Sequence, residues 1–227
     1  MAGLHVVIEG SIGSGKTTLT NGLLPFLKHY FTKAQIVPEP IQKWTSYGSQ
    51  KDNILAQMYK NPKRNSFLFQ VVASVTKVRE LVELGKDEKG IKLAERSLEA
   101  QSKVFIPHLS QDNMLTASEK EALIEMIDIM LLQPGVKPDL ILYLQASPDA
   151  VMSRIKLRNR AEEEGITMEY LTKLHIHYEK WLTNPLIKTP VIIINAEDIT
   201  KVKPENVVKQ IVQFSERKDN PLREDGQ

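Results

Sequence analysis

The stretch Gly10-Ser11-Ile12-Gly13-Ser14-Gly15-Lys16-Thr17 decides the fold, and it follows directly on the apolar run His5–Glu9. It fits the pattern G-x-x-x-x-G-K-[S/T], which marks a phosphate-binding loop where it joins a strand to the start of a helix. Glycines let such a loop turn its backbone N–H groups inward, and the helix adds its positive N-terminal end. The pattern predicts nucleoside triphosphate binding, with Lys16 at the β- and γ-phosphates and the Thr17 hydroxyl on Mg²⁺. The alternative, a glycine-rich turn that matches by chance, is uncommon just after a leading strand.

Length and composition favour one large α/β domain. The chain has 227 residues, enough to bury a sizeable core, and its 30 basic and 28 acidic residues nearly balance. Because that balance leaves no basic footprint for duplex nucleic acid, we expect no nucleic-acid partner. The absence of cysteine excludes a disulfide framework. There is no run of 18 apolar residues, and the first strand begins within four residues of the N-terminus. We therefore expect no membrane span, no targeting segment and a cytoplasmic location.

Short apolar runs rich in β-branched residues predict five buried strands, at His5–Glu9, Gln35–Pro38, Ile91–Ala94, Leu140–Gln145 and Val191–Asn195. Their continuous apolarity, rather than alternation, favours a parallel sheet that helices cover on both faces. Helical patterns lie between the runs. We therefore predict a single doubly wound α/β domain with a five-stranded parallel sheet over residues 1–214, with ligands at the carboxyl ends of the strands. Residues 215–227 are polar and predict a flexible C-terminal tail.

Several helix boundaries are also marked in the sequence. Pro25 is expected to kink or shorten the helix that follows the phosphate-binding loop, whose apolar pattern extends to Tyr30. The pattern Ser118-Glu-Lys-Glu121 predicts a capping box at the start of another helix. Ser147-Pro148 predicts a helix that runs toward Arg160, and a further helix is predicted from about Met168 to Leu182.

Two polar clusters end the second and third predicted strands. Glu39 stands between two prolines that stiffen its turn, where its carboxylate is placed to take a proton from an attacking hydroxyl. A solvent-facing turn glutamate is the alternative. Glu95 is placed to hold Mg²⁺ through water, and Arg96 beside it to contact phosphoryl oxygens or a carboxylate. Here the alternative is an exposed ion pair at a strand end.

A third cluster lies after the fourth predicted strand. Arg154 and Arg158 are four residues apart on one helical face, and Arg160 precedes a charged segment that ends at Gly165. This arrangement predicts a lid whose arginines close over a triphosphate and neutralise charge in the transition state. A solvated, charged helix end is the more usual interpretation of such a run.

Together these segments resemble the deoxynucleoside kinases, the group of the deoxycytidine, deoxyguanosine and mitochondrial thymidine kinases and the insect multisubstrate enzyme. The resemblance runs from about residue 4 to residue 199. It rests on the phosphate-binding loop, Pro38–Trp44, Tyr59 with Phe69-Gln70, Glu95-Arg96-Ser97, Arg154–Ile166 and Tyr170–Leu182. It implies a homodimeric phosphate-loop kinase with a helical lid. Such an enzyme phosphorylates a deoxynucleoside at its 5′-hydroxyl with Mg-ATP, in nucleotide salvage.

The resemblance also implies a role for each matching residue. Glu39 resembles the general base, supported by Arg96 and Lys16 in catalysis. Tyr59 and Glu163 resemble the pair that binds the 3′-hydroxyl, and Gln70 the amide at the Watson–Crick edge of the base. The residues expected to hold ATP are Gly10, Ser11, Ile12, Gly13, Ser14, Gly15, Lys16, Thr17, Thr18, Arg154, Arg158, Arg160 and Asp198. Those expected at the deoxynucleoside are Glu39, Trp44, Tyr59, Phe69, Gln70, Lys77, Arg96, Gln101 and Glu163, and those at Mg²⁺ are Thr17 and Glu95.

Two positions depart from the family pattern and bear on the choice of base. Lys77 stands where the deoxycytidine and deoxyguanosine kinases have an arginine, and Gln101 replaces their aspartate. Thymidine-preferring members are apolar at both positions, which leaves room for the 5-methyl group. The two long polar side chains therefore predict a preference for deoxycytidine or a purine deoxynucleoside over thymidine. The alternative is that neither side chain touches the base.

Two other functions stay open on the sequence. A nucleoside monophosphate kinase of the thymidylate kinase type shares the loop, the sheet and the lid. It needs a basic residue for the phosphate of its acceptor, however, and Glu39 occupies that place. A nucleotide-dependent switch protein of the GTPase type is the second alternative, although the chain has no Asn-Lys-x-Asp motif.

Overall fold

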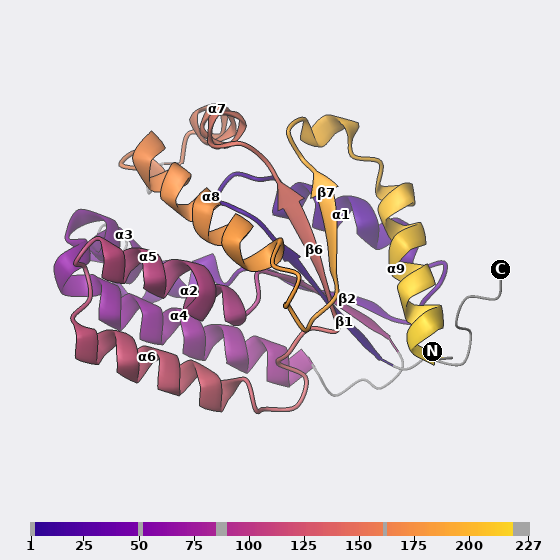
Figure 1. The fold of residues 1–227 in the computed structure, drawn as a ribbon, viewed down its shortest axis with the longest axis horizontal. Helices are drawn as coiled ribbons and strands as arrows, with labels where there is room; N and C mark the ends of the chain where they lie inside the picture. Colours follow the sequence, from indigo (N-terminus) through magenta and orange to yellow (C-terminus); the bar gives the residue numbers. More distant parts are fainter. Residues whose placement is uncertain (1–2, 50–51, 85–89, 161–162, 220–227) are drawn as a thin grey trace.

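Five parallel strands in the order β2-β5-β1-β6-β7 form the centre of the molecule (Figure 1). The structure is a computed structural model, and it describes residues 3–49, 52–84, 90–160 and 163–219. The strands are β1 (Leu4–Glu9), β2 (Ala34–Val37), β5 (Ile91–Glu95), β6 (Leu140–Gln145) and β7 (Val191–Asn195). All neighbouring pairs among them are parallel. The five predicted strands are confirmed to within one residue at each end. The chain leaves β1 toward one edge of the sheet and crosses to the other side at β6. The carboxyl end of β1 is therefore the switch point where such folds bind ligands.

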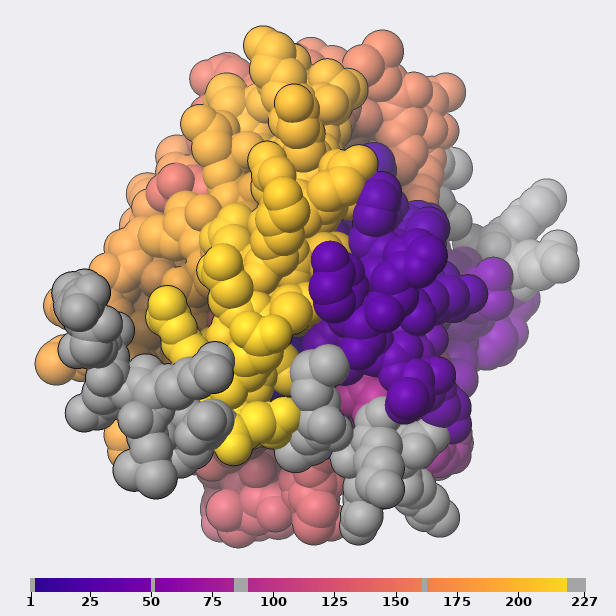
Figure 2. Space-filling model, turned by 90° about the vertical axis from the view of Figure 1, so that its right-hand side faces the viewer, coloured from indigo at the N-terminus to yellow at the C-terminus, as the bar shows by residue number. Residues whose placement is uncertain are grey.

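Helices cover both faces of this sheet. They are α1 (Lys16–Leu27), α2 (Ile41–Ser46), α3 (Ile54–Lys60), α4 (Pro62–Leu84), α5 (Ile106–Gln111), α6 (Ala117–Met130), α7 (Pro148–Arg158), α8 (Met168–Leu182) and α9 (Pro204–Asp219). Shorter elements are a π-helical turn η1 (Gln101–Phe105), a 3₁₀ turn η3 (Ile199–Lys201) and the hairpin of β3 (Gly48–Ser49) and β4 (Asp52–Asn53). Helices α1 and α9 lie side by side on one face, as Figures 1 and 2 both show, and α4, α6 and α8 lie on the other.

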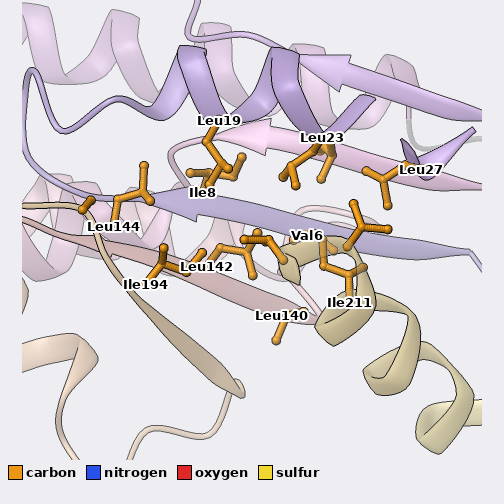
Figure 3. Close-up of a cluster of buried hydrophobic side chains, with 14 of the residues drawn as sticks. Val6, Ile8, Leu19, Leu23, Leu27, Leu140, Leu142, Leu144, Ile194 and Ile211 are labelled. Atoms are coloured by element: carbon orange, nitrogen blue, oxygen red, sulfur yellow. The ribbon is translucent and has the colours of Figure 1, made fainter. Parts of the chain in front are cut away.

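The core explains why the strands are apolar on both faces. Val6 and Ile8 of β1 pack toward α1 and α9, where Leu23 and Ile211 meet them (Figure 3). Val7, between them in sequence, faces the opposite side with the cluster that includes residues of α4 and α6. Side chains alternate along a strand, and all three valine and isoleucine side chains are fully buried. The predicted doubly wound α/β architecture is confirmed.

The helix ends confirm some boundary predictions and correct others. Helix α1 ends at Leu27, two residues past Pro25, so the helix is shortened as expected. The capping box of α6 lies two residues earlier than predicted. The Thr116 hydroxyl accepts from the Glu119 backbone N–H, and the Glu119 carboxylate accepts from the backbone of Thr116. The sequence offers two overlapping boxes, and the helix starts at the first. Helix α8 spans the predicted residues, whereas α7 ends at Arg158 because Asn159 adopts a left-handed conformation.

The predicted boundary of the C-terminal tail at residue 215 is wrong. Helix α9, which has no counterpart in the predicted elements, continues to Asp219, and Ser215 is 2% exposed within it. The apolar side chains Val207, Val208 and Ile211 hold this helix against the sheet. The rest of the predicted tail, 220–227, lies outside the described residues. In the described part of the chain, none of the helices combines the length and the apolarity that crossing a bilayer requires.

Candidate active site

A cavity of about 860 Å³ opens at the carboxyl ends of the strands, between the phosphate-binding loop and helices α2 to α5 and α7 to α8. It brings together most of the predicted site residues. Those in its wall are Ile12, Gly13, Gly15, Lys16, Thr17, Thr18, Glu39, Trp44, Tyr59, Phe69, Gln70, Glu95, Arg96, Gln101, Arg154, Arg158, Arg160 and Glu163. The loop residues Gly10, Ser11 and Ser14 are not part of that wall. Separate segments of sequence thus converge on one site.

The phosphate-binding loop has the backbone that its glycines make possible. Gly15 has a φ of +100°, and a Cβ atom there would lie 2.7 Å from Ile199 Cγ1. The Lys16 ammonium donates to the carbonyls of Gly10 (3.0 Å) and Ser11 (2.8 Å). Burial lowers the pKa of Lys16 to about 7, and the nearby Arg96 charge acts in the same direction. Phosphate oxygens beside this ammonium would favour its charged form.

Thr17 and Glu95 form the pair that fits a magnesium ion. The Thr17 hydroxyl donates to Glu95 Oε2 at 2.9 Å, so the two predicted ligands meet at the loop. Mg²⁺ takes oxygen ligands. In enzymes that act on nucleoside triphosphates, one or two protein oxygens hold it together with water and substrate phosphates. A hydroxyl and a carboxylate next to the start of α1 match that donor set.

Glu39 and Arg96 form an ion pair at the cavity wall, with Arg96 Nε 2.8 Å from Glu39 Oε1. Burial by itself raises the pKa of Glu39, but the Arg96 and Lys16 charges outweigh it and hold that pKa below its usual value. The carboxylate is therefore ionised at neutral pH and can accept a proton. This geometry favours the functional interpretation of both residues over an exposed turn and an exposed ion pair, because Arg96 is 5% exposed.

Aromatic and amide side chains line another part of the cavity. Trp44 and Phe69 meet edge to face with ring centroids 5.3 Å apart, and the Trp44 indole N–H donates to the Thr76 hydroxyl. Gln70 and Gln101 are 3% and 7% exposed, and Oε1 of each is buried without a hydrogen bond from any described residue. Because buried amides are almost always paired, these two amides in the cavity wall have hydrogen-bonding capacity left for a ligand, as donor or acceptor once the amide is turned.

The lid arginines make two different sets of contacts. Arg158 forks onto Glu163, with N–O distances of 2.6, 2.7 and 3.2 Å, and Arg160 lies 3.7 Å from the same carboxylate. Arg154 instead donates to the carbonyls of Ser14, Ala196 and Glu197, which ties the phosphate-binding loop to the segment after β7. Glu163, predicted at the 3′-hydroxyl, is thus also the partner of the lid.

Besides the three loop residues, two further predicted contact residues lie away from the cavity wall, Lys77 and Asp198. Lys77 Nζ donates to the backbone carbonyl of Glu95 at 2.7 Å, which turns the ammonium behind the end of β5. Asp198 caps η3, where its carboxylate accepts from the backbone and the hydroxyl of Thr200, and its neighbour Ile199 lines the cavity instead. The structure therefore does not bring Lys77 to a base or Asp198 to an adenine. In both cases a backbone partner close in space satisfies the charged group.

Sequence reasoning missed two buried polar residues behind Arg96. Glu9 ends β1 with no exposure, and Tyr178 of α8 is equally buried. The Tyr178 hydroxyl accepts a short hydrogen bond from Arg96 Nη1. A carboxylate at the end of an otherwise apolar strand was the available signal for Glu9. No comparable signal exists for Tyr178, because a tyrosine at a core position of a helix is ordinary.

Comparisons with known proteins agree with this geometry. A sequence model of the family described as deoxynucleoside kinase matches residues 6–216. Deoxycytidine kinase of Homo sapiens is 33% identical over 92% of this chain and 90% of its own length. Deoxycytidine kinase 1 of Xenopus laevis is 32% identical, with 92% and 89% covered. Mitochondrial thymidine kinase 2 of Homo sapiens is 29% identical, with 85% and 70% covered. The phosphate-binding loop, the Glu39–Arg96 pair and these similarities together show that the chain belongs to the deoxynucleoside kinase family.

Proposed function

We propose that this kinase transfers the γ-phosphoryl group of ATP to the 5′-hydroxyl of a deoxynucleoside. The observation that carries the proposal is the ionised Glu39 carboxylate, held by Arg96 at 2.8 Å in the wall that also contains residues of the phosphate-binding loop, Gln70 and Gln101. A general base must lie within hydrogen-bond reach of the hydroxyl that it deprotonates. An acceptor whose ring lies beside Gln70 and Gln101 and whose hydroxyl points toward the phosphate-binding loop would place that hydroxyl near Glu39.

Each residue then has a defined task in the transfer. Lys16 and the loop N–H groups hold the donor phosphates, and Arg158 and Arg160 stabilise charge on the transferring group. Glu39 takes the proton as the 5′-oxygen forms its bond to the γ-phosphorus, and the bond from that phosphorus to the bridging oxygen of ADP breaks. Mg²⁺, held by Thr17 and Glu95, would neutralise charge on the phosphates. The products are a deoxynucleoside 5′-monophosphate and ADP.

An acceptor panel tests this proposal against the two alternatives. The enzyme is incubated with Mg-ATP and either a deoxynucleoside, a deoxynucleoside monophosphate or no acceptor, and the products are separated. We expect monophosphate from the deoxynucleoside arm and negligible turnover in the other arms, because Glu39 repels the phosphate of a monophosphate acceptor. Diphosphate in the second arm would instead favour a monophosphate kinase. ADP without acceptor would favour a switch protein.

We further propose that deoxycytidine or a purine deoxynucleoside is preferred over thymidine. Because Lys77 lies behind the wall, the preference depends on Gln101, a long polar side chain in the cavity where a 5-methyl group needs apolar space. The similarity to deoxycytidine kinase of Homo sapiens, 33% identical over 92% of this chain, supports the same preference. A methyl-sized mismatch changes kcat/KM by about 10- to 200-fold, and we expect a preference in this range.

Substitutions of Gln101 and Lys77, the two residues that depart from the family pattern, should affect the preference over thymidine differently. Gln101→Ala is expected to shift the ratio of kcat/KM values toward thymidine by about tenfold, since it opens space at the base. Lys77→Met is the comparison variant, and it should leave that ratio unchanged even if overall activity falls. The measurement is kcat/KM for deoxycytidine and thymidine with each protein. Thymidine as the best substrate of the unmutated enzyme would contradict the proposal.

We also propose that the protein forms a homodimer through α4. Leu68, Val75 and Val82 are 52%, 37% and 38% exposed, and their spacing of seven residues places them on one side of the helix. Ile129 of the neighbouring helix α6 is 57% exposed. An apolar stripe of this kind on a charged surface is typical of an interface between copies of a chain.

Charge placed in this stripe is expected to separate the copies. Leu68→Glu should convert a dimer to a monomer in sedimentation velocity, because it buries an unpaired carboxylate in the interface. Leu186→Glu, at an 85% exposed leucine of the segment between α8 and β7, is the matched control and should remain dimeric. A monomeric unmutated protein would contradict the proposal.

The cytoplasmic location expected from the sequence stays a prediction.

A further inference from the structure

A buried chain of hydrogen bonds runs from Glu39 away from the cavity and ends at β1. Arg96 Nε donates to Glu39 Oε1 at 2.8 Å, and Arg96 Nη1 donates to the Tyr178 hydroxyl. The Tyr178 hydroxyl donates in turn to Glu9 Oε2 at 3.4 Å. Glu9 Oε1 accepts from the backbone N–H of Ser97 at 2.7 Å and from its hydroxyl at 2.6 Å. The chain thus links the catalytic carboxylate to the strand that precedes the phosphate-binding loop.

Every group behind Glu39 in this chain is shielded from water. Arg96 is 5% exposed, Ser97 is 1% exposed, and both Tyr178 and Glu9 are fully buried. Water cannot replace a lost partner at such depth, so each hydrogen bond in the chain fixes the next. Burial also raises the pKa of Tyr178 well above its usual value, so its hydroxyl keeps the proton that it donates to Glu9.

Arg96 needs this support because its own backbone does not favour its position. Its φ of +63° lies in the left-handed region, which a residue with a side chain adopts only when its surroundings hold it there. Its backbone N–H donates to the carbonyl of Ile8 at 3.0 Å, and its guanidinium lies 4.7 Å from the centre of the Phe105 ring. These contacts fix the backbone and one face of the guanidinium. The Tyr178 hydroxyl is the contact that fixes its rotation in the plane of the hydrogen bonds.

We propose that Tyr178 is a positioning residue of this kinase, whose hydroxyl holds Arg96 in the orientation that presents Glu39 to the acceptor hydroxyl. The tyrosine stands between the Arg96 cation and the second carboxylate, Glu9. It prevents a direct pair between Arg96 and Glu9 that would compete with the pair to Glu39. Tyr178 belongs to α8, the helix that follows the lid segment, so the same contact connects that helix to Glu39, the proposed general base.

The inference rests on the proposed function, and its test compares two matched tyrosines. Tyr178→Phe keeps the ring and removes the hydroxyl. Tyr143→Phe does the same to a neighbouring buried tyrosine, whose ring stacks on Tyr178 with centroids 6.0 Å apart and whose hydroxyl donates to Glu179 at 2.6 Å. Both variants lose one hydrogen bond to a buried or half-buried carboxylate. Only the first touches Arg96.

Steady-state kinetics and thermal unfolding of the full-length protein give the readout. We expect Tyr178→Phe to lower kcat by about tenfold or more, because a buried charged donor loses its acceptor. The KM values for the deoxynucleoside and ATP should stay within about twofold, since no binding contact is removed. Tyr143→Phe should keep kcat within about twofold of the unmutated enzyme, and the melting temperatures show that both variants are folded under the assay conditions.

Several results would overturn the inference. They are an unchanged kcat in Tyr178→Phe, an equal fall of kcat in both variants, or a rise in KM without a fall in kcat. If Tyr178→Phe melts below the assay temperature, Glu9→Gln tests the same chain, because an amide N–H₂ competes with Arg96 for the Tyr178 oxygen. Full kcat in that variant also overturns the inference. If the unmutated enzyme phosphorylates no deoxynucleoside, the proposed function itself is overturned. If the unmutated enzyme is active and the variants behave as just described, only the role of Tyr178 is overturned.

Discussion

Replacing Glu39 with glutamine is expected to lower kcat by about 10²–10⁴-fold, the usual loss when a positioned general base is removed. Glutamine keeps the size of the side chain and an oxygen that can accept from Arg96 Nε, so the cavity should keep its shape. Deoxynucleoside affinity should change little, because the amide can still bind the 5′-hydroxyl but cannot take its proton. Steady-state kinetics and equilibrium binding with the same deoxynucleoside provide the measurement.

The pH dependence gives a second readout of the same substitution. Arg96 and Lys16 hold the pKa of Glu39 below its usual value, so on the acid side the unmutated enzyme should keep its activity until the pH falls through that lowered pKa. The acid limb should disappear in Glu39→Gln. Glu121→Gln, at an exposed glutamate of α6, is the control and should behave as the unmutated enzyme. A Glu39→Gln enzyme that keeps more than about a third of kcat would remove Glu39 as the base.

The Lys16→Ala variant is expected to lose phosphoryl transfer almost entirely, by at least about 10³-fold in kcat/KM. Removal of one preorganised donor at a developing charge costs about 10²–10³-fold, and the Lys16 ammonium supplies a full charge in addition. In the structure this ammonium bonds only carbonyls of its own loop among the contacts described, so the fold should survive its removal. ATP binding, followed by calorimetry, should weaken together with turnover.

Lys28→Ala provides the matched control for this substitution. Lys28 is an exposed lysine at the other end of the same helix, 12 positions after Lys16, and it does not line the cavity. Its removal should leave kcat/KM within about twofold. An active Lys16→Ala enzyme would contradict the assignment of the phosphate-binding loop itself, whatever the acceptor is.

The strands and the loop were predictable because their patterns are local. Five apolar runs and one glycine-rich segment predict their own local structure, and the alternation of strands with helices indicates a parallel sheet. The end of the chain also carried a local signal. Helix α9 begins at Pro204 and has apolar residues at helical spacing, Val207, Val208 and Ile211, which pack against the sheet. The charged residues among and after them made the segment read as a polar tail from residue 215.

Some residues of the candidate site were likewise predictable from local patterns, and others were not. Glu39, Arg96 and Gln70 were predictable because they stand at strand ends or in motifs with fixed spacing. Lys77 was placed by its motif position, but a flexible side chain can turn either way, and here it finds the Glu95 carbonyl behind the wall. Tyr178 could not be predicted, because its role depends on how its hydroxyl contacts Arg96 and Glu9. The three residues are far apart in the sequence and meet only in the folded protein.

The most direct test of the central claim follows one oxygen atom through the reaction. Deoxycytidine labelled with ¹⁸O at its 5′-hydroxyl is incubated with the enzyme and Mg-ATP, and the product is examined by mass spectrometry and ³¹P NMR. Attack by the 5′-oxygen on the γ-phosphorus predicts deoxycytidine 5′-monophosphate that retains the label in its bridging C–O–P oxygen. Loss of the label from that bridge, phosphate on the 3′-oxygen, or ADP without phosphorylated deoxycytidine would contradict the account.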